Sequence, residues 1–330
     1  MATLTKERRP QTRRSGSGRD RGVRRAKRAA IGRQIKHNWQ LYVMLILPVA
    51  YMIVFHYWPM YGVQIAFRNF NPIDGISASP WVGLQHFERF INAYQFWPLI
   101  ENTVFLHVYE LVVRFPLPII LALALNHVRV RWFRASVQMI TYAPHFISTV
   151  VVVGILFLLL DPRTGLLNNL MSLVGIEGVN FMGDPGMFRH VYVWSSAWQS
   201  MGFSAIIYLA ALSSVPQELH EAAVVDGATK LQRMWHIDLP SIMPIAVILL
   251  ILDIGSILSV GFEKVLLMQT PLNMGTAEVI DTYVYKVGIA SQVPQISYAA
   301  AIGLFRAVIG LVLLVIANQI ARRLAKTSLW

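Results

Sequence analysis

The sequence predicts an all-helical integral membrane protein in which six helices cross the membrane and both termini lie in the cytoplasm. Of its 330 residues, 55% are hydrophobic and only 14% are charged, and the mean hydropathy is +0.50. A water-soluble domain normally carries about 25% charged residues, so this composition is typical of a membrane protein. The chain contains no cysteine, which excludes disulfide scaffolds, thiolate metal sites and thiol nucleophiles.

Residues 1–40 form a basic arm ahead of the first apolar run. The arm holds 13 Lys or Arg against Glu7 and Asp20, so it carries a net charge of +11 out of the chain's +12. It has too little apolar surface to fold alone, and we expect it to be disordered in the cytoplasm. Nucleic acid also attracts such arms, but a basic flank beside a first span is the commoner cause, so no nucleic-acid partner is predicted.

Six apolar runs are long enough to cross the roughly 30 Å of hydrocarbon in a bilayer. Each run must be helical, because a lone strand would leave its backbone polar groups unpaired in lipid. Residues 41–330 are therefore predicted to form one transmembrane domain. The spans lie at about residues 41–66, 102–125, 136–160, 191–212, 242–262 and 298–320.

The orientation follows from the basic residues in the tails and connections. Counted from the N-terminal tail, the odd-numbered segments hold 21 Lys or Arg and the even-numbered segments hold 6. By the positive-inside rule, both termini face the cytoplasm. The same rule places the long connection 213–240, between the fourth and fifth spans, on the cytoplasmic side.

The cytoplasmic loop 213–240 has the signals of a short helical hairpin. Ser214 with Gln217 resembles a capping box, and the helix that follows is predicted to reach about Val225. Gly227 can adopt the left-handed conformation that ends a helix. A proline at position 240 would then begin the fifth span.

The hairpin offers a surface on which another protein could dock. Ala222 and Ala223 are small enough for close approach, and Glu218, Glu221 and Asp226 supply carboxylates for a partner. An ordinary helix lying at the membrane surface would show the same pattern. The residues alone leave both interpretations open.

One spacing in this loop resembles a known family. Glu221-Ala222-Ala223, three residues, Gly227, nine residues, Ile237, one residue and Leu239-Pro240 match the EAA loop of permease subunits of type I ABC importers. In that family the loop forms the coupling helix, which sits in a groove of the ATP-binding subunit. The resemblance implies the type I importer permease fold and an ATPase-coupling role for Glu218, Glu221, Ala222, Ala223, Asp226, Gly227, Ile237, Leu239 and Pro240.

Further stretches resemble particular branches of the family. Residues 81–87 and 96–103 are similar to sugar permeases, and residues 57–67, 142–148, 279–285 and 328–330 are similar to LplB-type importers. The resemblance implies import of a polysaccharide or complex oligosaccharide, with alginate as one candidate, across the bacterial cytoplasmic (inner) membrane.

The same resemblance implies a set of partners. These are a second homologous permease subunit, a homodimer of ATP-binding subunits, an extracytoplasmic solute-binding protein, the saccharide and membrane lipid. No cofactor is expected in this chain, because the partner subunits would bind ATP and Mg.

No enzymatic constellation is present in the sequence. It lacks the P-loop pattern G-x-x-x-x-G-K-[ST], the zinc pattern H-E-x-x-H and the nucleophile elbow G-x-S-x-G. The alternative to an ATP-driven importer is therefore an ion-coupled secondary transporter or channel, which would use charges inside the membrane.

Four such charges fall within the predicted spans: Glu110, Arg114, Asp253 and Arg306. We interpret them as structural, with Glu110 neutralising Arg114 four residues on and Asp253 pairing with Arg306 across the bundle. A paired buried charge costs far less than a lone one.

A candidate sugar path lies on the fourth span. Trp194, Trp198 and Tyr208 share a face, and Gln199 stands near them. Aromatic rings stack on sugar rings, while amides bind sugar hydroxyls. Tryptophan is also common at membrane interfaces because of its contacts with lipid, and we favour an interfacial tryptophan belt over a sugar site here.

Overall fold

The computed structural model describes residues 37–324, which consist of helices and turns with no β-strand and one isolated bridge between Arg68 and Trp81. Most of the basic arm and the whole of residues 328–330 lie outside the described residues. The chain divides into two compact units, residues 1–62 and 63–330.

The described part of the first unit is a helix that continues to the unit boundary. It consists of α2 (Trp39–Met52), the π-helical η1 (Ile53–Tyr57) and α3 (Trp58–Met60), followed by the 3₁₀ turn η2 (Tyr61–Phe67). The π turn precedes Pro59, which has no N–H, and a wide turn is one way to absorb that missing donor. No side chain of α2, η1 or α3 is buried.

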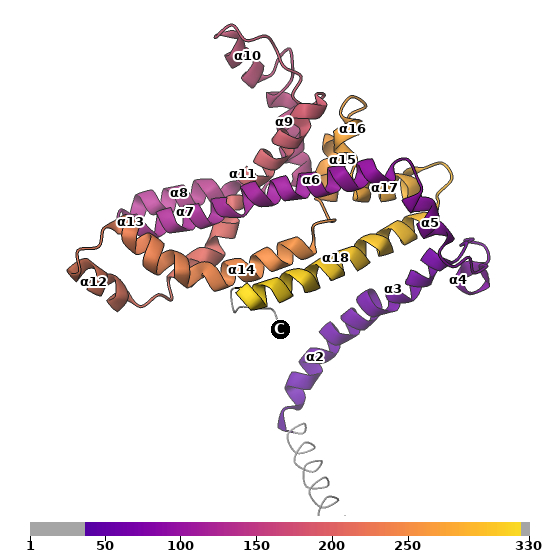
Figure 1. The fold of residues 1–330 in the computed structure, drawn as a ribbon, viewed down its shortest axis with the longest axis horizontal. Coiled ribbons are helices and arrows are strands. Elements are labelled where there is room, and N and C mark those ends of the chain that lie inside the picture. Colours follow the sequence, from indigo (N-terminus) through magenta and orange to yellow (C-terminus); the bar gives the residue numbers. More distant parts are fainter. Residues whose placement is uncertain (1–36, 325–330) are drawn as a thin grey trace, which may run out of the picture. The chain divides into compact units, whose positions relative to one another are not determined.

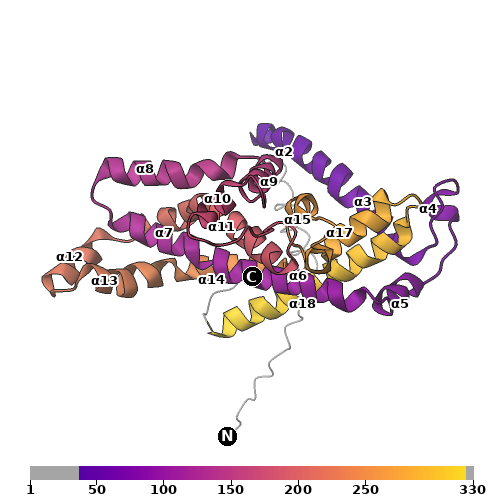
Figure 2. The same cartoon turned by 90° about the horizontal axis from the view of Figure 1, so that it is seen from above.

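Three long helices run alongside one another in the second unit (Figures 1 and 2). The first, Phe96–His127, joins α6 (Phe96–Arg114) to α7 (Pro116–His127). The second, Lys230–Gly255, joins α13 (Lys230–Arg233), the π-helical η4 (Met234–Asp238) and α14 (Leu239–Gly255). The third is α18 (Ile296–Leu324).

Two bent pairs of helices complete the membrane-spanning set. One pair joins α8 (Arg131–Tyr142) and η3 (Ala143–Phe146) to α9 (Thr149–Leu159) with a bend of 101°. The other joins α11 (Pro185–Leu212) to α12 (Gln217–Val225) with a bend of 76°. With helix Trp39–Phe67, the described residues therefore hold four helices long and apolar enough to span, or six if each bent pair is one span.

The break inside the third predicted span has a local cause. Pro144 lies in η3, and the two residues that follow η3 are extended, with ψ of 130° at Ile147 and 149° at Ser148. The Ser148 hydroxyl then accepts a hydrogen bond from the backbone N–H of Val151, which starts α9 as a new helix.

Short helices fill the connections between the long ones. At one end of the long helices lie α5 and α17, and at the opposite end lie α12 and α13 (Figures 1 and 2). Their bounds are α4 (Gly75–Ala78), α5 (Gln85–Ile91), α10 (Leu166–Ser172), α15 (Phe262–Met268), α16 (Met274–Ala277), α17 (Ile280–Tyr285) and the π-helical η5 (Lys286–Ala290).

Helix α11 is the centre of the second unit. It packs against α6, α7, α8 and α14, while α14 also packs against α18. Its buried Phe188, Tyr192 and Val193 belong to one apolar cluster, and Ala205 and Tyr208 belong to another. Because α11 touches most other spans, side chains along it are placed to line any path through the unit.

Candidate functional site

The loop 213–240 forms an exposed hairpin at one end of the bundle. Helix α12 begins at Gln217, with Pro216 in the cap position and no side-chain capping bond. The predicted capping box at Ser214 is wrong, because the hydroxyl of Ser214 donates instead to the carbonyl of Ala211, 2.7 Å away. Ser214 therefore lies in the turn that follows α11, bonded back to the last turn of that helix.

The end of α12 follows the prediction. The helix ends at Val225, and Gly227 has φ of +79°, in the left-handed region. The backbone N–H of Ala228 donates to the carbonyl of Ala223 at 2.8 Å, and the N–H of Gly227 donates to Val224 at 3.0 Å. This pair of bonds is the Schellman pattern, in which a left-handed residue satisfies the last carbonyls of a helix.

The fifth span begins earlier than predicted. Thr229 caps α13 through a capping box with Gln232, and from Lys230 the helix continues to Gly255. The prediction that the span starts at Pro240 is wrong. The π turn that ends at Asp238 precedes this proline, so the helix passes through it.

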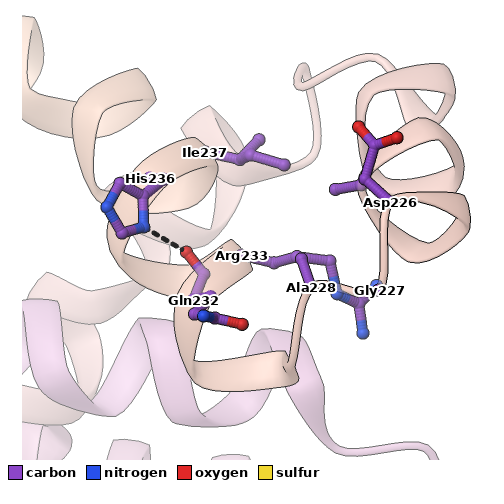
Figure 3. Close-up of a pocket in the computed structure, with 8 residues that line it drawn as sticks. Asp226, Gly227, Ala228, Gln232, Arg233, His236 and Ile237 are labelled. Atoms are coloured by element: carbon purple, nitrogen blue, oxygen red, sulfur yellow. Dashed lines mark hydrogen bonds between the residues drawn. The ribbon is translucent and has the colours of Figure 1, made fainter.

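A hollow of about 350 Å³ separates the end of α12 from α13 and η4 (Figure 3). Arg233 extends toward the turn at Gly227, and its Nε is buried without a hydrogen bond among the described residues. His236 turns away, and its Nδ1 donates to the carbonyl of Gln232 at 2.8 Å. The hollow is lined by Ala223, Asp226, Gly227, Ala228, Gln232, Arg233, His236 and Ile237.

The nine residues given an ATPase-coupling role lie in the loop 213–240 and differ in burial. Ala223, Ile237 and Leu239 are half-buried at its base. Glu221 accepts a hydrogen bond from Gln217 at 2.9 Å, which holds its carboxylate along the helix surface. The remaining six are exposed: Glu218, Glu221, Ala222, Asp226, Gly227 and Pro240. The hairpin thus presents small residues and carboxylates outward on a short, capped helix.

A second site is a polar cavity of about 470 Å³ beside the middle of helix Phe96–His127. It is open, and its lining comes from α6, α11, the break between α8 and α9, and the start of α15. Irregular backbone at membrane depth is tolerated where it is buried in protein or lines a water-filled cavity. The polar and charged residues of its lining are Glu110, Arg114, His145, Ser148, Thr149, Tyr192, Ser196, Gln199, Ser200, Glu263 and Lys264.

Two cations face this cavity, and only one has an ion-pair partner. As predicted, Arg114 pairs with Glu110, with Nη1 3.3 Å from Oε1. The hydroxyl of Tyr192 donates to the other oxygen of Glu110 at 3.5 Å. Lys264 is 6% exposed and donates to the hydroxyl of Ser196 at 2.9 Å, and among the described residues no carboxylate pairs with it.

The predicted pairing of Asp253 with Arg306 is wrong. Arg306 forms its ion pair with Asp281 of α17. Helix α17 packs against α18, which brings Asp281 to Arg306, whereas the sequence indicated only a loop in that region. Asp253 lies near the end of α14, and its backbone carbonyl is 3.2 Å from Nε2 of His107.

The predicted sugar face of α11 is divided between three environments. Trp194 and Trp198 line an apolar hollow of about 460 Å³ next to α9 and α10. Tyr208 is buried in the core and cannot line a path. Gln199 alone reaches the polar cavity, where its amide donates to the carbonyl of Ile147 at 2.9 Å.

Sequence reasoning missed Lys264, because it was counted as a charge of an outside loop. A signal was present on α11: Ser196, Gln199 and Ser200 are spaced three and four residues apart and share one helix face. No pattern in the sequence linked that face to the start of α15.

Comparisons with known proteins agree on one family. The sequence profile described as "Binding-protein-dependent transport system inner membrane component" matches residues 115–326. Over 290 residues, the chain is 43% identical to the "Polygalacturonan/rhamnogalacturonan transport system permease protein YteP" of Bacillus subtilis (strain 168), covering 88% of this chain and 90% of that protein. Over 297 residues, it is 43% identical to "Protein LplB" of the same organism, covering 90% and 92%.

A solved structure has a similar fold. One chain of the "Crystal structure of bacterial alginate ABC transporter in complex with alginate pentasaccharide-bound periplasmic protein" superimposes with a TM-score of 0.82 at 40% identity. The match covers 90% of this chain and 99% of that chain.

Proposed function

This chain belongs to the family of inner membrane components of binding-protein-dependent transport systems, and we propose that it forms half of the path through which an ATP-driven importer moves a polysaccharide or complex oligosaccharide. It is the permease subunit of a sugar importer of the ABC type, located in the inner membrane, and it is a transport component rather than an enzyme. Family membership leaves no observation in favour of the ion-coupled alternative.

The importer works with a partner permease, an ATPase and a solute-binding protein. We propose that two identical ATPase subunits, which bind ATP and Mg, complete the assembly and that both termini of this chain face them. The exposed hairpin at α12 supports this arrangement, because its outward carboxylates and small residues suit a protein groove. The excess of basic residues on the same predicted side of the membrane supports the orientation.

The substrate path is proposed to pass through the polar cavity. Hydroxyl and amide groups of Ser196, Gln199 and Ser200 line it, and such groups bind sugar hydroxyls. Arg114 and Lys264 would attract carboxylates, and one similar structure is described as a transporter for import of the acidic polysaccharide alginate. An acidic saccharide, with alginate as one candidate, is therefore our proposed substrate class.

One observation carries the coupling proposal: the EAA spacing falls on an exposed, Schellman-capped helix at the end of the bundle. Affinity capture from mild-detergent membranes tests it. Wild type should recover an ATPase and a second permease, while Glu221→Lys should lose the ATPase. Glu177→Lys, which changes another exposed carboxylate, is the matched control and should recover both. An ATPase retained by Glu221→Lys would contradict docking at this helix.

A further inference from the structure

We propose that the buried carboxylate of Asp238 is a tie between the coupling helix α12 and the second and fifth spans, and that it transmits the movement of α12 to them. The proposal rests on the function proposed above, because it concerns how the coupling loop acts on the membrane helices. Three distant segments meet at this point. His127 ends α7, His220 lies in α12, and Asp238 ends η4 directly before α14.

The burial of Asp238 requires an explanation. Its side chain is 0% exposed, and neither of its oxygens has a hydrogen-bond partner among the described residues. Transfer of an unpaired carboxylate into a protein interior is strongly unfavourable. An apolar side chain of similar size would often be more stable there, so the charge has a use other than stability.

Two histidines from different helices lie against this carboxylate. Nε2 of His220 is 3.3 Å from Oδ1 of Asp238, and Nε2 of His127 is 3.5 Å from Oδ2. Nδ1 of His127 also donates to the carbonyl of Leu123 at 3.2 Å. A carbonyl and a carboxylate both only accept, so each ring nitrogen of His127 faces an acceptor.

The tie is placed where movement of the loop must enter the membrane helices. Leu239, the next residue, packs in an apolar cluster with Ala122 and Leu123 of α7 and with residues of α11. A close-packed cluster of this kind moves as a unit. Tilting α12 away from it would separate His220 from Asp238, a polar contact that is largely shielded from water, where electrostatic interactions are stronger than in bulk solvent. Movement of α12 therefore carries α7 and α14 with it.

The physical tie is tested on the purified chain by hydrogen exchange. Asp238→Asn keeps the shape and removes the charge, so exchange in α12 and at the end of α7 should become several-fold faster, with α18 unchanged. His236→Leu is the matched control, because His236 bonds only within its own helix. Unchanged exchange in α12 would overturn the tie. If Asp238→Asn also exchanges fast in α18, that variant is unfolded. Exchange in α12 and α7 is then measured on His220→Leu instead, because His220 lies on the exposed hairpin.

Transmission is tested in the assembled importer in proteoliposomes, with alginate and polygalacturonan oligosaccharides as probes. Asp238→Asn and His220→Leu should each raise the ATP consumed per sugar imported by about fivefold or more, and the double variant should add little to either. His220→Gln, whose amide can still donate to Asp238, should retain more coupling than His220→Leu. Wild-type ratios in both single variants would overturn transmission.

Failure of the proposed function and failure of the inference about Asp238 give different results. If the wild-type assembly imports neither probe, the proposed function and the transmission that rests on it are both contradicted, whatever hydrogen exchange shows. If the wild type imports and the variants match it, only the inference about Asp238 fails.

Discussion

At the scale of single residues, the unpaired ammonium of Lys264 sets the chemistry of the polar cavity. Its nearest polar partner is a neutral hydroxyl, Ser196, and the ring of Tyr192 lies 5.5 Å away. Glu110 also acts on Lys264 electrostatically, but its ion pair is with Arg114. A buried charge without an ion pair of its own is costly and usually functional in a membrane protein. A carboxylate on the transported sugar would supply the missing partner. Lys264 is thus the residue at which acidic and neutral saccharides would be distinguished.

We expect Lys264→Met to reduce import of carboxylate-bearing oligosaccharides by about tenfold, because a hydrogen bond to a charged group contributes about 1.5–3 kcal/mol. Import of neutral oligosaccharides should change much less. Competition between a carboxylate-bearing and a neutral oligosaccharide in proteoliposomes measures the ratio of their import rates. Lys286→Met is the control, since Lys286 pairs with Glu278 at 3.2 Å and does not line the cavity. Equal losses for both probes would contradict a role in charge selection, and Lys264→Arg should preserve the preference.

The backbone of Gly227 supports a second prediction at this scale. A Cβ at this position would meet no atom within 4 Å, so only the positive φ opposes a side chain. Gly227→Ala should therefore cost about 1–2 kcal/mol at the end of α12. We expect weaker capture of the ATPase in detergent, measured by titration. Gly303→Ala, also with free space but with ordinary helical φ, should leave capture unchanged. Equal capture by both variants would show that the left-handed turn is not needed.

At the scale of elements, the contact between α8 and α11 depends on Gly202. A Cβ there would meet the backbone carbonyl of Thr141, and backbone cannot swing aside as a side chain can. Gly202→Ala should cost about 1–3 kcal/mol through overpacking and lower the midpoint of thermal unfolding by several degrees. The matched variant is Gly154→Ala in α9, where the space is free. The midpoints of both variants are measured by thermal unfolding of the detergent-solubilised chain. Equal midpoints for Gly202→Ala and Gly154→Ala would contradict the close approach of α8 and α11 at Gly202.

The elements also show which features the sequence could predict. Apolar run length predicted six spans, and the described residues hold four helices that could span, or six if each bent pair is one span. The left-handed Gly227 was predictable because one residue type suits that turn. The partner of Arg306 was not predictable, because it depends on where α17 folds back against α18. The contact of Asp238 with two histidines has the same origin, since residues 127, 220 and 238 share no spacing. Local patterns predict helices and turns, whereas cross-helix pairs depend on packing that the pattern does not contain.

At the scale of the whole molecule, each of the two units, taken by itself, leaves surface uncovered. In the first unit, taken by itself, α2, η1 and α3 have apolar side chains and no buried residue among those described. In the second unit, the polar cavity is open on one side. Both features fit a subunit that completes its transport path with a partner permease.

The orientation of the molecule gives the last prediction. The hairpin at α12 and the connection between α5 and α6 lie at opposite ends of the long helices (Figures 1 and 2), and the excess of basic residues places the α12 end in the cytoplasm. Val225 and Tyr94 mark these two ends, and each side chain is 87% exposed. Because the natural chain has no cysteine, Val225→Cys and Tyr94→Cys each create a single labelling site.

A membrane-impermeant maleimide should label Tyr94→Cys in intact cells and Val225→Cys only in inside-out vesicles, with the chain expressed without its partners. Both variants should react after permeabilisation, which controls for accessibility. The reverse labelling pattern would place α12 outside, where no ATPase could reach it. Such a result would contradict the coupling role of the hairpin, because the movement that drives import must enter the molecule at its cytoplasmic end.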